Sequence, residues 1–236
     1  VTLPAPTNIG VSVLDYDRNR NYRFLVVAGT KLYNYSSEGK RIEGWKTDAA
    51  QQTLISAPEL FQKNGKDYIV TSTATKLLIL NRRGEERVNT ESTTSSNSPW
   101  VIKNESIPYA ERVGNQGELQ RQSWDGSSST STDPMGEVLG LSFESYGKVL
   151  WNTEEVEVRS ENGTQRFKVE GIENVLCYPG GTGLIVGASA IQVVNLKTGE
   201  NYGSFTGNSA VAGRLSPTGM PVLVIRQGGA IICYEL

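Results

Sequence analysis

The hydrophobic pattern of residues 22–40, YRFLVVAGTKLYNYSSEGK, predicts a strand, a tight turn, a second strand and a second turn. The apolar run at residues 24–27 stops at a Gly-Thr pair, an alternating run follows, and Glu38 and Gly39 supply the next turn. Related segments recur along the chain and end in the same kind of glycine turn, at Gly84, Gly126, Gly163 and Gly199. The chain is therefore expected to consist of repeated β-meanders.

A second signature precedes the meanders: a short apolar strand followed by a turn rich in Gly, Asn or Pro. The equivalent apolar positions, which we expect to be buried between sheets, are Leu14, Leu60, Ile102, Phe143, Leu176 and Leu215. They are separated by 46, 42, 41, 33 and 39 residues, and propeller blades repeat every ~40–50 residues. We therefore expect an all-β fold with almost no helix, a single six-bladed β-propeller domain of four-stranded antiparallel blades over residues 1–236.

The two ends of this array differ from its middle. Residues 41–45 are expected to form the outer strand of the first blade, whereas the last repeat stops at Leu236, in what aligns as its third strand. An open sheet edge invites aggregation, and propeller blades pack into a ring. We therefore expect residues 1–4 to pair with the C-terminal blade as its fourth strand and to close the ring.

Charge and composition restrict the class of partner. The chain has 23 basic and 25 acidic residues and a formal net charge of −2, so it lacks the basic excess of nucleic-acid binders. No run approaches the ~20 apolar residues of a membrane span. Cys177 and Cys233 lie in apolar, strand-like contexts, so we expect buried unpaired thiols, with a disulfide or a reactive thiol as the alternative. A monomer is expected.

Catalytic and metal-binding groups are scarce. The sequence has no histidine, which removes the commonest general base and metal ligand. One turn has the alternating oxygen side chains of a calcium loop, at Asp15, Asp17, Asn19 and Asn21. However, Arg20 replaces the loop glycine and Val26 stands at the twelfth position, so a plain turn is the main interpretation. No catalytic residue, cofactor or metal is expected.

The inner strands suggest a set of residues that line a central channel. Alternation away from the packed apolar positions selects Val13, Glu59, Val101, Ser142, Val175 and Arg214. Glu59 and Arg214 are expected to form an ion pair across the channel, with a contact to a small ligand or partner peptide as the alternative. Glu173 shares their facing.

Two tryptophans mark candidate binding loops. Trp45 and Trp151 lie in strand-like runs and are expected to pack between blades. Trp100 and Trp124 instead border the polar stretches at residues 89–98 and 127–134, which are long for tight turns. Both stretches are expected on the same face of the propeller. They form either a contact surface with Trp100 and Trp124 as anchors or disordered decoration.

The phrases LDYDRNRNYRFLVVAG, KLYNYSSEGKRIEGW, KNGKDYIV and LLILNRRGEERV resemble the repeats of uncharacterised β-propeller proteins from the cell envelope of Gram-negative bacteria. The segment IQVVNLKTGENYGSF is more distantly similar to the quinoprotein-type (PQQ-like) repeat. The closer resemblance covers about the first 90 residues. It implies a periplasmic or surface-associated, non-enzymatic scaffold, and it carries no catalytic residues to this chain.

Two functions follow as hypotheses. The first is an interaction scaffold of the bacterial envelope that binds a protein or cell-surface polymer through loops on one face. The alternative is a carbohydrate-processing or other small-molecule enzyme with its site at the channel mouth, which would require convergent carboxylates in a deep pocket.

Overall fold

The computed structural model describes residues 2–7, 9–46, 52–178, 180–207, 209–214, 221–227 and 230–235. Within these ranges the strands are the regular elements and there is no helix, as the sequence predicts. It follows that this part of the chain contains no apolar helix long enough to cross a membrane.

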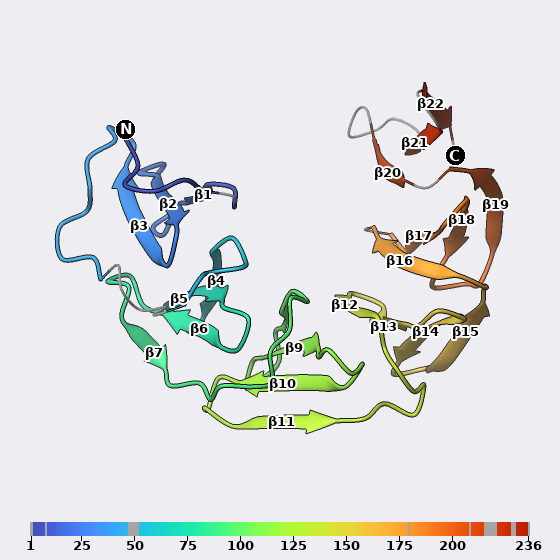
Figure 1. Ribbon diagram of the computed structural model, residues 1–236, viewed down its shortest axis with the longest axis horizontal. Helices are drawn as coiled ribbons and strands as arrows, with labels where there is room; N and C mark the ends of the chain where they lie inside the picture. Colours follow the sequence, from blue (N-terminus) through green and yellow to red (C-terminus); the bar gives the residue numbers. More distant parts are fainter. Residues whose placement is uncertain are drawn as a thin grey trace. The chain divides into compact units, whose positions relative to one another are not determined.

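The strands form six sheets that follow one another along the chain, and Figure 1 shows the strands of each sheet in chain order. The first three sheets contain β1 (Ser12–Leu14), β2 (Arg23–Ala28), β3 (Lys31–Ser36), β4 (Glu59–Lys63), β5 (Lys66–Ser72), β6 (Leu77–Leu80), β7 (Glu86–Val88), β8 (Val101–Lys103), β9 (Tyr109–Val113), β10 (Leu119–Ser123) and β11 (Ser128–Ser131). The last three contain β12 (Gly140–Glu144), β13 (Gly147–Trp151), β14 (Glu155–Ser160), β15 (Gly163–Lys168), β16 (Ile172–Cys177), β17 (Thr182–Gly187), β18 (Ala190–Asn195), β19 (Asn201–Thr206), β20 (Ser209–Arg214), β21 (Pro221–Gln227) and β22 (Ala230–Glu235).

The second to fifth sheets have the expected four strands, whereas the first and sixth have three among the described residues. The prediction of an outer strand at residues 41–45 is wrong, because only an isolated bridge joins Arg41 to Tyr35. Gly44 adopts a φ of 75° in a turn, and the Trp45 indole N–H donates to the Leu32 carbonyl at 2.7 Å. The Trp45 contact and the turn at Gly44 therefore stand where the prediction placed strand pairing with β3.

Most of the repeated glycine turns share one backbone conformation, whereas Gly163 differs, with a φ of 124°. Gly39, Gly84 and Gly199 have φ angles of 76°, 76° and 82°, which glycine adopts without the steric cost that a Cβ imposes. At the second of these turns the Asn81 side-chain oxygen accepts the Arg83 backbone N–H at 2.8 Å and so stabilises the reversal. This turn chemistry explains the repetition seen in the sequence.

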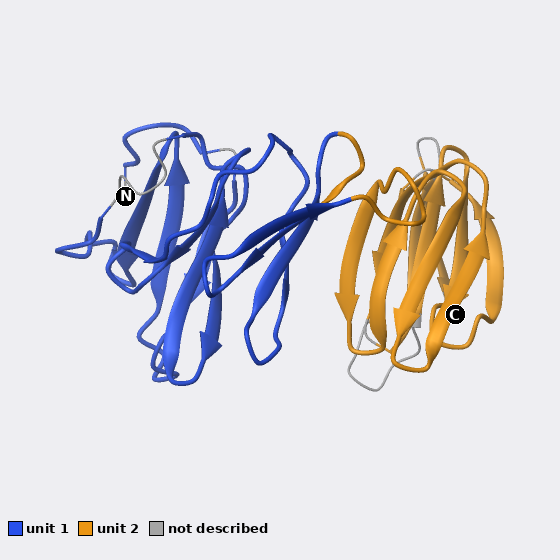
Figure 2. Cartoon of the chain, turned by 90° about the horizontal axis from the view of Figure 1, so that it is seen from below, with its two compact units in different colours: residues 1–115, 120–131 blue, residues 116–119, 132–236 orange. Residues whose placement is uncertain are grey.

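Contacts divide the chain into two compact units, coloured separately in Figure 2. Unit 1 comprises Val1–Asn115 and Gln120–Ser131, and unit 2 comprises Gln116–Leu119 and Thr132–Leu236. In each unit, apolar side chains of neighbouring sheets interdigitate. In unit 1 the first and second sheets meet around Leu25 and Ile69, and the second and third meet around Ile79 and Ala110, all fully buried. The expectation of a single domain remains a prediction.

The core of unit 2 is built in the same way. The fourth and fifth sheets pack around Val149 and Ile185, and the fifth and sixth pack around Leu184 and Leu223. The middle sheet of each unit, the second in unit 1 and the fifth in unit 2, therefore has apolar side chains packed on both of its faces. This is why the strands carry continuous apolar runs, such as LLIL at residues 77–80, rather than strict alternation.

The apolar positions predicted to be equivalent have two different facings. Leu14 is buried, Leu215 lies outside the described residues, and four are half-buried: Leu60, Ile102, Phe143 and Leu176. Leu14 and Leu176 pack toward the sheet that follows them, whereas Leu60 and Ile102 pack toward the sheet that precedes them. The expected alignment is therefore wrong by one residue between these strands, since successive side chains of a strand point to opposite faces.

The first sheet has an apolar face that packs against no other sheet among the described residues. Val13 is 54% exposed there, beside a hollow of about 330 Å³ lined by Leu3, Phe24 and Tyr35. Residues 2–4 are not part of a strand, and Leu3 packs on this face. Ring closure by residues 1–4 is thus not shown.

The sixth sheet also exposes apolar side chains. Val211 and Ile231 are 59% and 75% exposed. Val211 pairs with Val224, which in turn pairs with Cys233, so these three side chains share one face of the sheet. The first and last sheets therefore each carry one exposed apolar face.

Candidate functional site

The polar stretch at residues 89–98 is an ordered loop that joins the second and third sheets. The Thr93 and Ser96 backbone N–H groups donate to the carbonyls of Thr75 and Ala74, at 2.7 and 2.8 Å. The Ser96 hydroxyl donates to the Val113 carbonyl at the end of β9, at 2.6 Å. The loop is therefore fixed to the β5–β6 turn of one sheet and to a strand end of the next.

Arg112 is the residue that holds this loop in place. Its side chain is 0% exposed, and it donates to the Ser96, Ala74 and Thr94 carbonyls at 3.0, 2.9 and 3.0 Å. The guanidinium also donates to Gln120 Oε1 at 2.8 Å. A planar guanidinium with five N–H groups suits such a convergent set of acceptors, which a lysine could not satisfy at once. Arg112 therefore fixes the loop conformation from the buried side of the loop.

The exposed side of the loop is polar and hydrogen-bonding. Its exposed residues, which we call the loop surface, are Glu91, Ser92, Thr94, Ser95 and Asn97. Because the underlying backbone is anchored, ordering this surface on binding would cost little conformational entropy.

Trp100 and Trp124 lie at opposite ends of the third sheet. Trp100 precedes β8 and lies under Arg112, whose guanidinium carbon is 4.6 Å from its ring centroid. Trp124 donates its backbone N–H to the Pro108 carbonyl, just before β9 begins. The expectation that both indoles flank one face is therefore wrong.

Both tryptophans are also half-buried in the packing between the second and third sheets. The Trp124 ring meets Phe61 in an edge-on contact, 5.7 Å between centroids, and lies 6.3 Å from Tyr68. The indole N–H groups of Trp100 and Trp124 are both buried. These contacts account for the two tryptophans as core residues, and their predicted role as binding anchors is left without geometric support.

The second polar stretch, residues 127–134, is largely a strand rather than a loop. Its residues Ser128–Ser131 form β11, the exposed outer strand of the third sheet. The Ser128 hydroxyl donates to the Glu91 carboxylate at 2.5 Å. This stretch therefore extends the loop surface at one residue but does not form a second loop.

The predicted channel residues are only partly described. Glu59 and Glu173 are exposed, on β4 and β16. Arg214 pairs with Pro221 through its backbone, and its side chain lies outside the described residues, so the Glu59–Arg214 ion pair remains a prediction. Val175 is buried against the fourth sheet, contrary to its expected channel facing. Side chains of an inner strand alternate between the two faces of their sheet, and the face that carries Val175 packs on the fourth sheet instead of lining a channel.

The turn at residues 15–21 is a hydrogen-bonded turn, as the main interpretation held. The Asp15 carboxylate accepts the backbone N–H groups of Asn19 and Arg20 at 3.1 and 2.9 Å. The Asn19 side chain accepts the Asn21 N–H at 2.9 Å. The oxygens are thus directed at the chain's own amides, and the described residues contain no group of acidic or cysteine side chains that could hold a metal.

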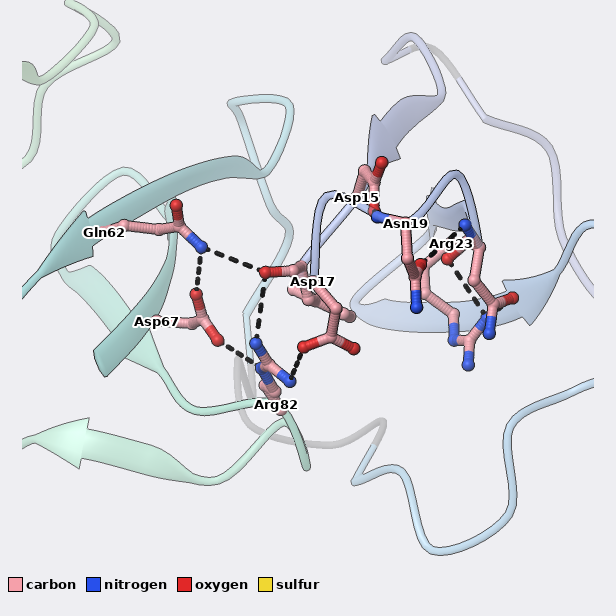
Figure 3. A network of polar contacts seen from close by, with 9 residues as sticks. Asp15, Asp17, Asn19, Arg23, Gln62, Asp67 and Arg82 are labelled. Carbon is pink, nitrogen blue, oxygen red and sulfur yellow. Dashed lines mark hydrogen bonds and ion pairs between the residues drawn. The ribbon is translucent and has the colours of Figure 1, made fainter. Parts of the chain in front are cut away.

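Arg82 joins this turn to the second sheet, as Figure 3 shows. Its guanidinium pairs with Asp17 at 2.7 Å, with the buried Asp67, and with the Tyr16 carbonyl at 3.2 Å. Gln62 donates to the other Asp67 oxygen at 2.7 Å. Although burial opposes it, these carboxylates raise the pKa of Arg82. The network is a structural tie between the two sheets.

The cysteines differ in environment. Cys177 is half-buried and Cys233 is exposed, and neither forms a disulfide. Burial, reinforced by Glu144, raises the pKa of the Cys177 thiol to about 12, so its thiolate is scarce at neutral pH. The expectation of unpaired thiols is confirmed, whereas that of burial fails for Cys233.

Buried charged residues are what the sequence interpretation missed. Besides Arg112, unit 2 contains Asp133 and Glu157, 6% and 2% exposed, both paired with Arg159. For Arg112 and Glu157 the one signal is a charged residue inside an apolar strand, as in YAERV at residues 109–113. That signal marks burial but does not identify the partners.

Comparisons with known proteins show the fold alone. No protein-family model matches the chain, and no curated protein matches it significantly. Among solved structures, the chain is similar to BBS1N in complex with ARL6DN, in crystals soaked with mercury or with lead, each at a TM-score of 0.62 and 13% identity over 96% of this chain and 78% of that chain. It is also similar to the dihydro-heme d1 dehydrogenase NirN in complex with DHE, at a TM-score of 0.65 and 14% identity over 99% of this chain and 54% of that chain. The likeness, together with the six consecutive antiparallel sheets, identifies the fold as that of β-propellers.

Proposed function

We propose that this chain is a non-enzymatic interaction scaffold that binds a protein or cell-surface polymer through the loop surface at residues 89–98. The observation that carries the proposal is the anchoring of this loop by the fully buried Arg112. A fixed polar loop on a rigid sheet scaffold suits recognition, because loops held by rigid elements present their side chains in one geometry.

The comparisons support this choice only at the level of the fold. BBS1N, a structural neighbour of this chain, was crystallised in complex with another protein, ARL6DN. NirN, a further structural neighbour, is a dehydrogenase, so the fold serves both classes and the choice depends on the site. The proposed location, periplasmic or at the cell surface, rests on the resemblance of the first 90 residues to envelope propeller proteins.

The test is capture of binding partners from an envelope extract. The loop variant carries Glu91→Arg and Ser95→Arg, and the matched control carries Glu161→Arg and Asn162→Arg in the exposed β14–β15 turn. We expect the loop variant to lose partners that the parent and the control retain, at equal melting temperature. Equal capture by all three proteins would contradict the assignment of the loop surface.

We further propose that the propeller closes, with the exposed apolar face of the sixth sheet packing on that of the first. Each face carries side chains more than half exposed, Val13 on one and Val211 and Ile231 on the other. Burying such side chains stabilises a fold by roughly 1.5–3 kcal/mol each. Leu3 packs beside the outer part of the first sheet. In a closed ring, the fourth strand of the sixth sheet would run at this place.

Closure can be tested with the thiol of Cys233, which shares the proposed contact face. In a Cys177→Ser background, closure predicts that Cys233 of the full chain is labelled slowly. Removal of residues 1–6 should then lower the melting temperature and make the labelling faster. Fast labelling that is the same with and without residues 1–6 would contradict closure.

A further inference from the structure

A basic hollow lies at the end of the second sheet that is remote from the loop surface. Its volume is about 430 Å³, and the charged residues that line it are Lys66, Asp67, Arg82, Arg83, Glu85 and Arg87. They come from the start of β5, the β6–β7 turn and β7. Since β5 spans seven residues, the hollow lies roughly 20 Å from the β5–β6 turn that holds the loop surface.

Two of these charges neutralise each other. Asp67 is 7% exposed, and its carboxylate accepts from Arg82 and from Gln62. Arg82 is further occupied by Asp17 at 2.7 Å. Arg82 and Asp67 therefore line the hollow as a paired group, and its net charge depends on the remaining side chains.

The remaining lining has an excess of positive charge. Lys66, Arg83 and Arg87 are exposed, and none has a carboxylate within ion-pair distance in the part of the chain that the structure describes. Glu85 is the one remaining acid, and it accepts from the Asn81 side chain at 3.0 Å. The nearby Glu86 is paired with Lys76 at 2.6 Å and therefore does not compensate them.

Local contacts hold the Arg87 side chain and the backbone at Arg83 in position. The Arg87 guanidinium carbon lies 5.4 Å from the Tyr68 ring centroid, an arrangement that orients a guanidinium through cation–π attraction. The Arg83 carbonyl accepts the Lys46 N–H at 2.7 Å, which fixes the backbone of the turn. All three cations line this one hollow.

We propose that this hollow binds an anionic sugar of an acidic polysaccharide, through its carboxylate or sulfate group. Arginine and lysine side chains are the usual partners of such groups, and the volume lies within the range of small-ligand sites. The lining has no apolar side chain, so the hollow offers no apolar pocket for the anchor side chains by which peptides are usually held in grooves. A polar, charged sugar fits this lining better than a peptide does.

The experiment measures binding of polygalacturonate, dextran sulfate and neutral dextran at low salt by calorimetry. The test variant carries Lys66→Glu, Arg83→Glu and Arg87→Glu. The matched control carries Lys31→Glu, Lys168→Glu and Arg226→Glu, which make the same change in net charge at exposed positions elsewhere. We expect the parent to bind at least one of the two acidic polymers but not neutral dextran. The test variant should lose affinity at least about tenfold and show a weaker salt dependence, as screened charge contacts predict, while the control should lose less than about threefold.

The two acidic polymers distinguish a carboxylate ligand from a sulfate ligand. Equal losses of affinity in both variants would show a general effect of net charge and would overturn the site. The site would also be overturned if the parent bound neither acidic polymer. Polyglutamate binding as tight as that of the polysaccharides, with the same loss in the test variant, would overturn the sugar assignment in favour of an acidic protein partner. Because the loop variant leaves this hollow intact, failure of one proposal is distinguishable from failure of the other.

Discussion

Arg112→Ala should destabilise the protein strongly, because it removes a buried group on which two sheets and a loop depend. The guanidinium donates to four described acceptors besides the Thr93 hydroxyl. Two of them keep a second donor: the Ala74 carbonyl accepts the Ser96 N–H, and the Thr94 carbonyl accepts the Gln120 amide at 3.4 Å. The Ser96 carbonyl and Gln120 Oε1 each lose the Arg112 donor.

The magnitude follows from those two acceptors. A buried acceptor that loses its donor costs about 1–3 kcal/mol, so the two together cost about 2–6 kcal/mol. The cavity over Trp100 adds to this cost, whereas water entering from the loop side reduces it. Arg112→Lys should cost less, since an ammonium can still reach part of this acceptor set.

Urea denaturation measures the change in unfolding free energy, and Arg83→Ala serves as an exposed-arginine control with an expected change within about 0.5 kcal/mol. Hydrogen exchange at the Thr93 and Ser96 amides reports the loop separately, because both amides donate to the β5–β6 turn and should lose protection in the variant. A cost below about 1 kcal/mol with both amides still protected would refute the view that Arg112 holds the loop.

Three further predictions concern the core and two ionisable groups. Leu14→Ala should cost about 2–5 kcal/mol in urea denaturation, because Leu14 is 6% exposed between the first two sheets; a cost under 1 kcal/mol would contradict its assigned packing. The Cys177 thiol, with its pKa raised to about 12, should react with a disulfide reagent at pH 8 far more slowly in the folded than in the unfolded chain, and equal rates would contradict its burial. Although burial opposes it, hydrogen bonds from Arg159 lower the pKa of Asp133 below its ordinary value of 3.8, so its stabilisation is full above that value and is lost as the pH falls through the lower, folded-state pKa. The stability difference between the parent and Asp133→Asn should therefore shrink below about pH 4, and a difference independent of pH would contradict the ion pair.

The sequence was sufficient to predict the class of fold and the repeat. Glycine turns and short apolar runs are local features, and the six sheets begin at or near the segments that carry the second signature. The face of its sheet on which each apolar side chain lies was harder to predict. Leu60 and Leu14 look equivalent, yet they pack toward each other from neighbouring sheets. A strand buried on both faces lacks the alternation that would set its register.

The site was less predictable because it depends on contacts between residues distant in sequence. Arg112 reaches Ala74, which is 38 residues away, and no local pattern encodes that contact. Trp100 and Trp124 were assigned to a surface because they border polar segments, but the neighbouring sheet covers them. Composition close to a tryptophan does not reveal which sheet will pack against it.

Photo-crosslinking in an envelope extract tests directly whether the loop surface binds a partner. A photoreactive amino acid replaces Ser92 on the loop surface in one protein and the exposed Asn162 in the β14–β15 turn in the other. We expect a discrete, reproducible adduct from position 92 that is absent from position 162 and disappears when Arg112→Ala releases the loop. The same adducts from both positions, or none from position 92, would contradict this expectation.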